Sequence, residues 1–484
     1  MLPRDNTVAL MNTPAHGRIY NWVPDPTSLL GGRVVATIAL LPHLETAGNE
    51  GRRQLCGCYV RVRNAGETNE PVPGRTDTLI VPIGNAQPNP EGNFLFEPGR
   101  GGGRLDKVPA TVTDSIAEWL ESGIPFSERE FRWRYIQASH FGEVNSYFHL
   151  DQIASYVHDL LRELDAPPLP RVTAVVNAHH AVTERDGMRD GLRRGDRWLP
   201  FQGGHYRLPS QRHDLAEHEP ISPDGEIHLG TGRNLVQYGA LVEAAGGPYR
   251  ANASHNAGIL YHEYGHHITR HTVDFRANNL RRPDRQNNRK VALDEGTCDY
   301  WAATMLGTPH IWAWHLRHDD RVTHPRSLCS PKTMADFDLG PTADAHSNGT
   351  IWGAALWDLR TRLGKIEMEG VRRTDLLILK ALLLLGRMPK DEGDTTIQSI
   401  RRIRKSYAEG LSALLQADEI LNARRHREAI LETFFQRGIQ PAMVPSMKEV
   451  HREELAEPDS RAEAPNGIMQ YLGSATVDGT DGEW

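Results

Sequence analysis

Long apolar runs are missing from this chain of 484 residues. A membrane-spanning helix needs about 20 consecutive apolar residues, and the best candidate, Leu376–Leu385, is short and contains Lys380. We therefore expect no membrane span and interpret this segment as a buried helix. The first residues also lack a basic stretch followed by an apolar one, so no secretory signal is visible and a cytoplasmic location is expected. A secreted protein is the alternative if the chain is a processed form.

The chain also has no excess of basic residues over acidic residues. Lys and Arg number 55 against 62 Asp and Glu, which gives a formal net charge of −7, so no nucleic-acid partner is expected. Cysteine is scarce, and four residues are too few for a disulfide scaffold in a chain of this length. A reducing compartment is the simplest interpretation. Hydrophobic residues at 39% and charged residues at 24% are typical of a folded globular protein.

The length of the chain favours two or three domains, and its patterns favour an α+β fold class. Residues 1–115 hold β-branched runs between Pro- and Gly-rich turns, which predicts a β-rich accessory domain. Residues 116–270 mix helical and strand patterns, and residues 271–444 are chiefly helical. Residues 445–484 are polar and acidic, which predicts a flexible tail.

Single elements follow from the same patterns. Apolar residues at helical spacing predict a helix over Gly142–Leu164. Strands are predicted from β-branched runs at Arg33–Leu41, Cys56–Ala65, Asp77–Gly84, Arg171–Ala178 and Gly225–Gly232.

The stretch ILYHEYGHHITRH, Ile259–His271, carries the first chemical signal. His262 and His266 are four residues apart, so a helix places both on one face, where two imidazoles can bind one zinc ion. Glu263 follows the first ligand and is angled toward a metal-bound water. Zinc lowers the pKa of that water, and a carboxylate in this position can accept its proton as a general base. The five-residue pattern is short enough to arise by chance, and an exposed polar helix face is the alternative. His271 lies off the shared face and is not expected to bind the metal.

A catalytic zinc needs a third protein ligand. The stretch ALDEGTCDYWAATMLG, Ala292–Gly307, has helical spacing and ends in a glycine stop signal. Glu295 and Asp299 are four residues apart and point the same way, so one can bind zinc while the other accepts the outer N–H of a ligating histidine. The alternative is a pair of surface carboxylates.

His-Glu-x-x-His followed by Glu-x-x-x-Asp on a second helix resembles the gluzincin zinc metallopeptidases. EGTCD is similar to the E-G-x-x-D of the fungalysin branch, and the thermolysin branch is more distant. The stretches EVNSYFHLDQIASYV, HSNGTIWGAALWDLR and FFQRGI also fit, so the resemblance covers roughly Phe141–Ile439. It implies a thermolysin-like, two-lobed catalytic domain in which a mixed α/β lobe and a mainly helical lobe meet at the His-Glu-x-x-His helix.

The resemblance also implies roles for single residues. One zinc ion per chain would be bound by His262, His266 and Glu295, with Glu263 as the base and Asp299 as the partner of a ligand.

A further histidine enters through the same resemblance. His346 would donate a hydrogen bond to the oxyanion of the tetrahedral intermediate, whereas capping or packing at a helix start is the alternative. Thr350 departs from the fungalysin pattern, which usually has glutamate there. Counting forward from His266 reaches RANNL, residues 276–280, and not the tyrosine that assists the oxyanion in the thermolysin branch.

The sequence thus predicts a zinc-dependent endopeptidase that acts on a peptide or protein substrate. The substrate backbone is expected to pair with an edge strand near Gly225–Gly232. A catalytically inactive, zinc-stabilised interaction module on the same fold is the alternative, favoured by Cys298, by Thr350 and by the lack of a recognisable propeptide. That lack also makes a regulatory or inhibitory partner possible.

Overall fold

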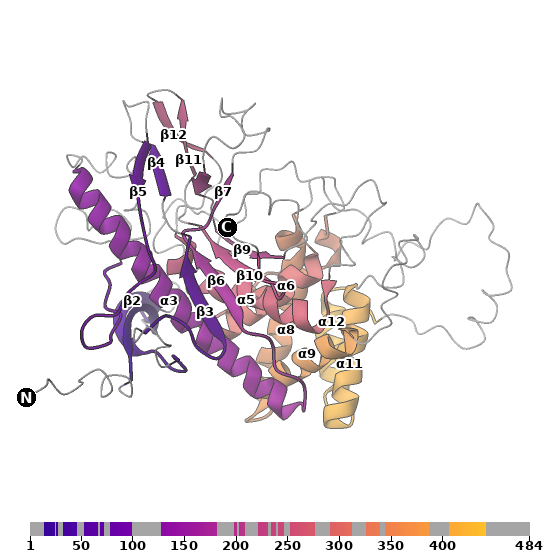
Figure 1. Ribbon diagram of the computed structural model, residues 1–484. Helices are drawn as coiled ribbons and strands as arrows, with labels where there is room; N and C mark the ends of the chain where they lie inside the picture. The colour runs from indigo at the N-terminus through magenta and orange to yellow at the C-terminus, as the bar shows by residue number, and fades with distance from the viewer. Residues whose placement is uncertain are drawn as a thin grey trace, which may run out of the picture.

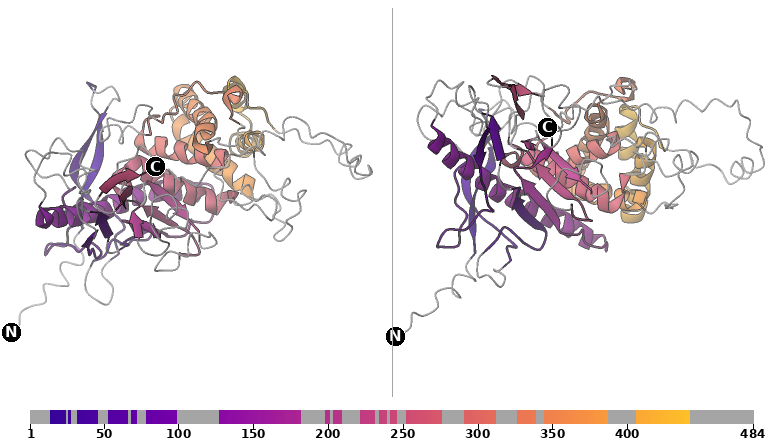
Figure 2. Two further views of the ribbon diagram at one scale, coloured as in Figure 1. Left: turned by 90° about the horizontal axis from the view of Figure 1, so that it is seen from above. Right: turned by 45° about the horizontal axis from the view of Figure 1, so that its top comes forward.

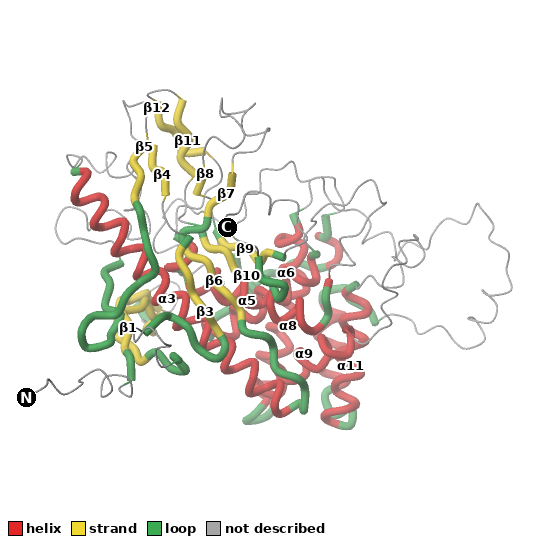
Figure 3. Tube along the Cα trace, viewed as in Figure 1, coloured by secondary structure: helices red, strands yellow, loops and turns green. Residues whose placement is uncertain are grey.

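A computed structural model describes the chain over a set of separate ranges. The strands and one long helix gather on one side of the molecule, and the other helices gather on the other side, so the expected α+β class is confirmed (Figure 3). The predicted tail, residues 445–484, lies outside the described residues. The described ranges are 14–24, 26–27, 32–45, 53–65, 68–71, 78–98, 127–181, 198–200, 203–208, 221–230, 234–238, 241–245, 252–275, 291–311, 326–338, 344–386 and 406–441.

A four-stranded sheet forms the centre of the strand-rich side (Figure 1). Its order is β3 (Val60–Asn64), β6 (Val172–Val176), β10 (Glu226–Leu229) and β9 (Gly204–Arg207). The first three strands are parallel, and β9 runs antiparallel at the edge. The strand predicted within Gly225–Gly232 is therefore present as β10, but it is an inner strand. The edge strand beside it is β9, so within the described residues an edge strand does lie near Gly225–Gly232.

β3 joins the first hundred residues to the rest of the fold. It pairs in parallel with β6 from Val60↔Val172 to Asn64↔Val176. One face of this pair is buried and apolar, and it includes Val62. The expected division at residue 115 therefore cuts through one sheet, because β-branched composition predicts a strand but does not specify the strand that it pairs with.

The remaining strands form separate two-stranded pairs. The strands predicted at Arg33–Leu41 and Asp77–Gly84 are present as β2 and β5. All four pairs are antiparallel: β1 (His16–Pro24) with β2 (Gly32–Leu40), β4 (Thr68–Pro71) with β5 (Thr78–Val81), β7 (His179–Ala181) with β8 (Trp198–Pro200), and β11 (Asn234–Tyr238) with β12 (Leu241–Ala245).

The longest helix, α3 (Glu128–Glu163), packs against β3 and β6 and crosses behind the sheet (Figure 1). It begins well before the predicted start at Gly142. Ser127 caps it by accepting a hydrogen bond from the Glu130 backbone N–H, so Ser-x-x-Glu marks the start. The first turn is charged, but Phe131, Tyr135 and Ala138 continue the buried apolar stripe at helical spacing, and the predicted helix did not include them.

The other helices form the second half of the molecule, and α5 lies between them and the sheet (Figure 2). The predicted buried helix over Leu376–Leu385 is part of α9. Among the described residues, no helix combines the length and apolar character that crossing a membrane requires. The α-helices are α5 (Ala257–Thr272), α6 (Ala292–Leu306), α8 (Ala345–Ile366), α9 (Gly370–Gly386), α11 (Tyr407–Asn422) and α12 (Arg427–Gln436), and the 3₁₀ helices are η3 (Ala253–His255) and η5 (Met334–Asp336).

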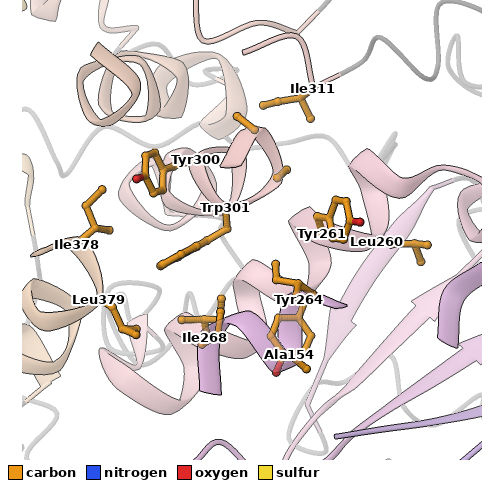
Figure 4. Close-up of a cluster of buried hydrophobic side chains, with 14 of the residues drawn as sticks. Ala154, Leu260, Tyr261, Tyr264, Ile268, Tyr300, Trp301, Ile311, Ile378 and Leu379 are labelled. Atoms are coloured by element: carbon orange, nitrogen blue, oxygen red, sulfur yellow. The ribbon is translucent and has the colours of Figure 1, made fainter. Parts of the chain in front are cut away.

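One hydrophobic core joins the two halves (Figure 4). Trp301 from α6 and Leu379 from α9 are completely buried near Ile268 of α5, and Tyr264 of α5 lies beside Ala154 of α3. Because α5 contributes to both sides of this core, its position relative to the sheet and to α6 is fixed by packing.

Glycine contacts bring α5, α6 and α8 unusually close together. A Cβ added at Gly265 of α5 would lie 2.7 Å from Cys298 Cα of α6. A Cβ added at Gly296 of α6 would lie 2.2 Å from the carbonyl oxygen of Gly349 in α8. Both distances are below van der Waals contact, so any side chain at these positions would force the helices apart.

We expect Gly296→Ala to destabilise the protein by about 1–3 kcal/mol, because its methyl group meets backbone atoms that cannot move independently. The free energy of unfolding from urea titration measures the loss. Gly84→Ala is the matched control, since a Cβ there meets nothing within 4 Å, and it should change stability by less than about 0.5 kcal/mol. Equal stability of the two variants would contradict the close crossing of α6 and α8.

Candidate metal centre

Helix α5 carries His262, Glu263 and His266 into the interior. Asn256 caps the helix by accepting from the backbone N–H groups of Gly258 and Ile259. The side chain of His262 is 1% exposed, and the His262 and His266 rings lie 4.9 Å apart at 84°. An exposed polar helix face is therefore the wrong interpretation of this motif.

Glu295 of α6 meets both of these histidines and one more. Its Oε2 lies 3.1 Å from His262 Nε2, 3.7 Å from His266 Nε2 and 3.2 Å from Nε2 of His346, which belongs to α8. Two atoms bound at about 2.0–2.1 Å to one tetrahedral metal lie roughly 3.3 Å apart. The distances from Glu295 Oε2 to His262 and His346 thus match the separation of two ligands on one ion, and that to His266 is somewhat longer.

In each of the three histidines, the other ring nitrogen, Nδ1, lies beside a carboxylate oxygen. Both nitrogens of each ring face a carboxylate oxygen, and a neutral ring can donate a hydrogen bond from only one of them. If Nδ1 donates to its own carboxylate, the Nε2 of a neutral ring carries a lone pair. Three lone pairs would then point at the acceptor Glu295 Oε2, which is unfavourable unless a cation lies between them. The donor set fits a metal ion for this reason. The outer pairs are His262 Nδ1–Asp299 Oδ1 at 2.8 Å, His266 Nδ1–Asp294 Oδ2 at 3.2 Å and His346 Nδ1–Asp344 Oδ1 at 2.9 Å.

The shifted pKa values also indicate that positive charge stabilises this cluster of side chains. Burial lowers the pKa of His266, but the charges of Asp294 and Glu295 outweigh it and raise this pKa to about 10. Burial raises the pKa of Asp344, whereas its hydrogen bond and ion pair with His346 hold that pKa well below its usual range. Without a metal, the cluster would take up protons instead.

The structure brings every residue predicted for the site together, and the charge of Glu263 is among those that raise the pKa of His266. Two groups of three donors have ligand atoms within 4.8 Å of one another: His262, Glu295 and His346, and His262, His266 and Cys298. His346 lies close enough to be a ligand itself. The cap of α8 is Asp344, which accepts from the His346 backbone N–H, so the capping alternative for His346 was wrong.

Glu263 lies against the edge strand. A Cβ added at Gly204 of β9 would lie 2.7 Å from Glu263 Cγ and 3.0 Å from its Oε1. The carboxylate therefore occupies space that any other residue at position 204 would fill. Sequence reasoning missed Gly204, because only the pairing of β9 with β10 reveals its position.

Three charged residues of the site were also missed. Asp344 could have been found, because Asp is favoured as the cap of a helix that starts just before His346. Asp294 directly precedes Glu295, and an acidic neighbour was a weak signal. Arg326 gave no signal: its Nε lies 2.7 Å from Asp299 Oδ2, and it reaches the site from outside the helices.

The remaining histidines of α5 anchor the helix. His267 is buried, with Nε2 2.9 Å from the Pro170 carbonyl oxygen and Nδ1 3.0 Å from the Tyr206 hydroxyl. His271 Nε2 lies 3.0 Å from the Asp224 carbonyl oxygen. These contacts bind α5 to β9 and to the turn before β10. Residues 276–280, where no tyrosine was found, lie outside the described residues.

A scan against protein-family models matches none of them to this chain, and a search of curated proteins finds no significant match. The resemblance to gluzincins therefore rests on the motifs alone, and function must be argued from the geometry of the site.

We expect one zinc ion per chain, because the groups within 3.7 Å of Glu295 Oε2 are imidazole nitrogens, which bind zinc together with carboxylates. Elemental analysis of the purified, dialysed protein measures it. Glu295→Ala and the double variant His262→Ala/His266→Ala should lose most of the metal, and His271→Ala should keep it. Undiminished zinc in the double variant would rule out this site.

Proposed function

We propose that this protein is a zinc-dependent endopeptidase of gluzincin type. The observation that carries the proposal is the single Glu295 oxygen that faces Nε2 of His262, His266 and His346 within 3.1–3.7 Å. A bound zinc would supply a Lewis acid that polarises the scissile carbonyl and lowers the pKa of a water molecule. The chain itself must then supply a base, an oxyanion donor and a place for the peptide.

Glu263 is the base in this proposal. It follows His262 directly, so it lies beside the metal ligands without sharing their face of the helix. Its carboxylate lies against Gly204 of β9, the edge strand with which an extended peptide backbone would pair. Glu263 would thus accept a proton from the attacking water and pass it to the leaving amine of a peptide held along β9.

His346 is the oxyanion donor in this proposal, and Asp344 determines how it acts. Because Asp344 accepts from His346 Nδ1–H, only the imidazolium form also carries a proton on Nε2. The neighbouring carboxylate stabilises this charged form. His346 would therefore donate to the oxyanion as a cation, which is a stronger donor than a neutral ring. Thr350 bonds back to the His346 carbonyl oxygen at 3.0 Å, so its departure from the fungalysin pattern leaves the start of α8 intact.

One observation favours the alternative of an inactive, zinc-stabilised module. His346 Nε2 lies 3.2 Å from Glu295 Oε2, close enough to be a fourth ligand beside His262, His266 and Glu295. Four protein ligands close the tetrahedral sphere and are typical of structural zinc, whereas a catalytic zinc keeps one position open. The two functions therefore differ in whether His346 binds the metal or the oxyanion.

Glu263→Gln should reduce peptide hydrolysis by about 10²-fold or more, since an amide cannot accept the proton of the water. Zinc content and unfolding temperature should match wild type. Cleavage of a mixed peptide library, followed by mass spectrometry, measures the rate. Near wild-type cleavage by this variant would show that the base is another group, and no cleavage by wild type would favour the inactive module.

His346→Ala separates the two functions directly. As an oxyanion donor, His346 acts mainly in the transition state, so its loss should lower kcat by about 10²–10³ and leave KM and zinc content nearly unchanged. As a fourth ligand, its loss should lower zinc affinity. Asp344→Asn is the companion variant and should lower kcat in the same direction, because it no longer stabilises the imidazolium. Activity within a few-fold of wild type would contradict the oxyanion role.

A further inference from the structure

Cys298 lies where α5 and α6 cross, next to the carboxylate that orients His262. Its side chain is completely buried. A Cβ at Gly265 would lie 3.0 Å from Cys298 Sγ, so the glycine between His262 and His266 makes room for the sulfur. The thiol is therefore packed against the part of α5 that carries both histidines.

Nitrogen and oxygen atoms that could bind a metal ion lie close to the Cys298 sulfur. Cys298 Sγ lies 3.3 Å from His266 Nδ1 and 3.5 Å from Asp294 Oδ1. His262, His266 and Cys298 each have a ligand atom within 4.8 Å of the others. Ligands of one tetrahedral ion are separated by roughly 3–4 Å, so little movement would bring these atoms onto one ion.

His262 belongs to both groups of donors, and His266 faces both Glu295 and the sulfur through its two nitrogens. The Nε2 of His266 faces Glu295, and its Nδ1 faces Cys298 and Asp294. The donors around Glu295 are nitrogen and oxygen atoms, which suit zinc. The other group contains the Cys298 sulfur, a soft donor that favours soft cations able to displace its proton. An ion on the sulfur side would break the Nδ1–Asp294 hydrogen bond that orients His266 toward Glu295.

We propose that Cys298 gives this protein a second metal-binding mode, in which a thiophilic cation such as Cd²⁺ is held by His262, His266 and Cys298. Binding in this mode would draw His266 away from Glu295, because it breaks the Nδ1–Asp294 hydrogen bond. If the proposed peptidase function holds, thiophilic cations are thus inhibitors that act through a buried thiol, and not only through competition for the zinc ligands.

The test isolates the buried thiol. Cys56, Cys58 and Cys329 are replaced by Ser, so that Cys298 is the remaining cysteine of the chain. The metal-free protein is titrated with Cd²⁺, and near-ultraviolet thiolate-to-cadmium absorption is recorded. We expect the band to saturate at one Cd²⁺ per chain, and to vanish when Cys298→Ser is added to the same background. Cd²⁺ affinity should fall by roughly 10–100-fold or more in that variant.

If the protein that keeps only Cys298 shows no thiolate-to-cadmium absorption band, this result alone overturns the proposal. An unchanged Cd²⁺ affinity in the Cys298→Ser protein would overturn it as well. Zinc-dependent peptide cleavage is measured on the same preparations. Peptide cleavage without a cadmium band would contradict the second metal-binding mode but not the peptidase function. A cadmium band without any peptide cleavage would contradict the peptidase function but not the second metal-binding mode.

Discussion

The convergence of three imidazole nitrogens on one buried carboxylate oxygen is the interaction on which the site depends. Glu295 is 1% exposed, and burial makes both its charge and an unpaired lone pair costly. The arrangement is stable only with protons or a metal ion between the acceptors. Helix α6 can present Glu295 to α5 and α8 together because Gly265 and Gly296 let the three backbones approach. The contacts between Glu295 and the histidines therefore depend on the close crossing of the three helices.

The edge of the sheet is part of the same arrangement. β9 lies against α5, with Gly204 at Glu263 and with Tyr206 bonded to His267. The strand and the helix are thus held together by one contact within the motif and one directly after it. A peptide that adds to β9 would be placed relative to Glu263 by the fold itself, since neither contact depends on a flexible side chain at the surface.

Local spacing was sufficient to predict much of the site and little of its surroundings. His262 and His266, like Glu295 and Asp299, are four residues apart, so a helix alone fixes their common direction. The pairing of β3 with β6 and the edge position of β9 depend on contacts between distant segments, and no local pattern encodes them. Arg326 is the same kind of case, because it meets Asp299 through the tertiary fold.

His346 shows how little separates an open metal site from a closed one. Asp344 fixes the proton on Nδ1, so the neutral ring presents a lone pair to the cluster, and the charged ring presents an N–H. A lone pair can complete a fourfold metal sphere, whereas an N–H cannot bind a metal and is left to donate to a substrate oxygen. Asp344 stabilises the charged ring, and a bound cation opposes it. If a metal ion is bound, the balance between these two charges would determine whether the same four side chains form a structural centre or a catalytic one.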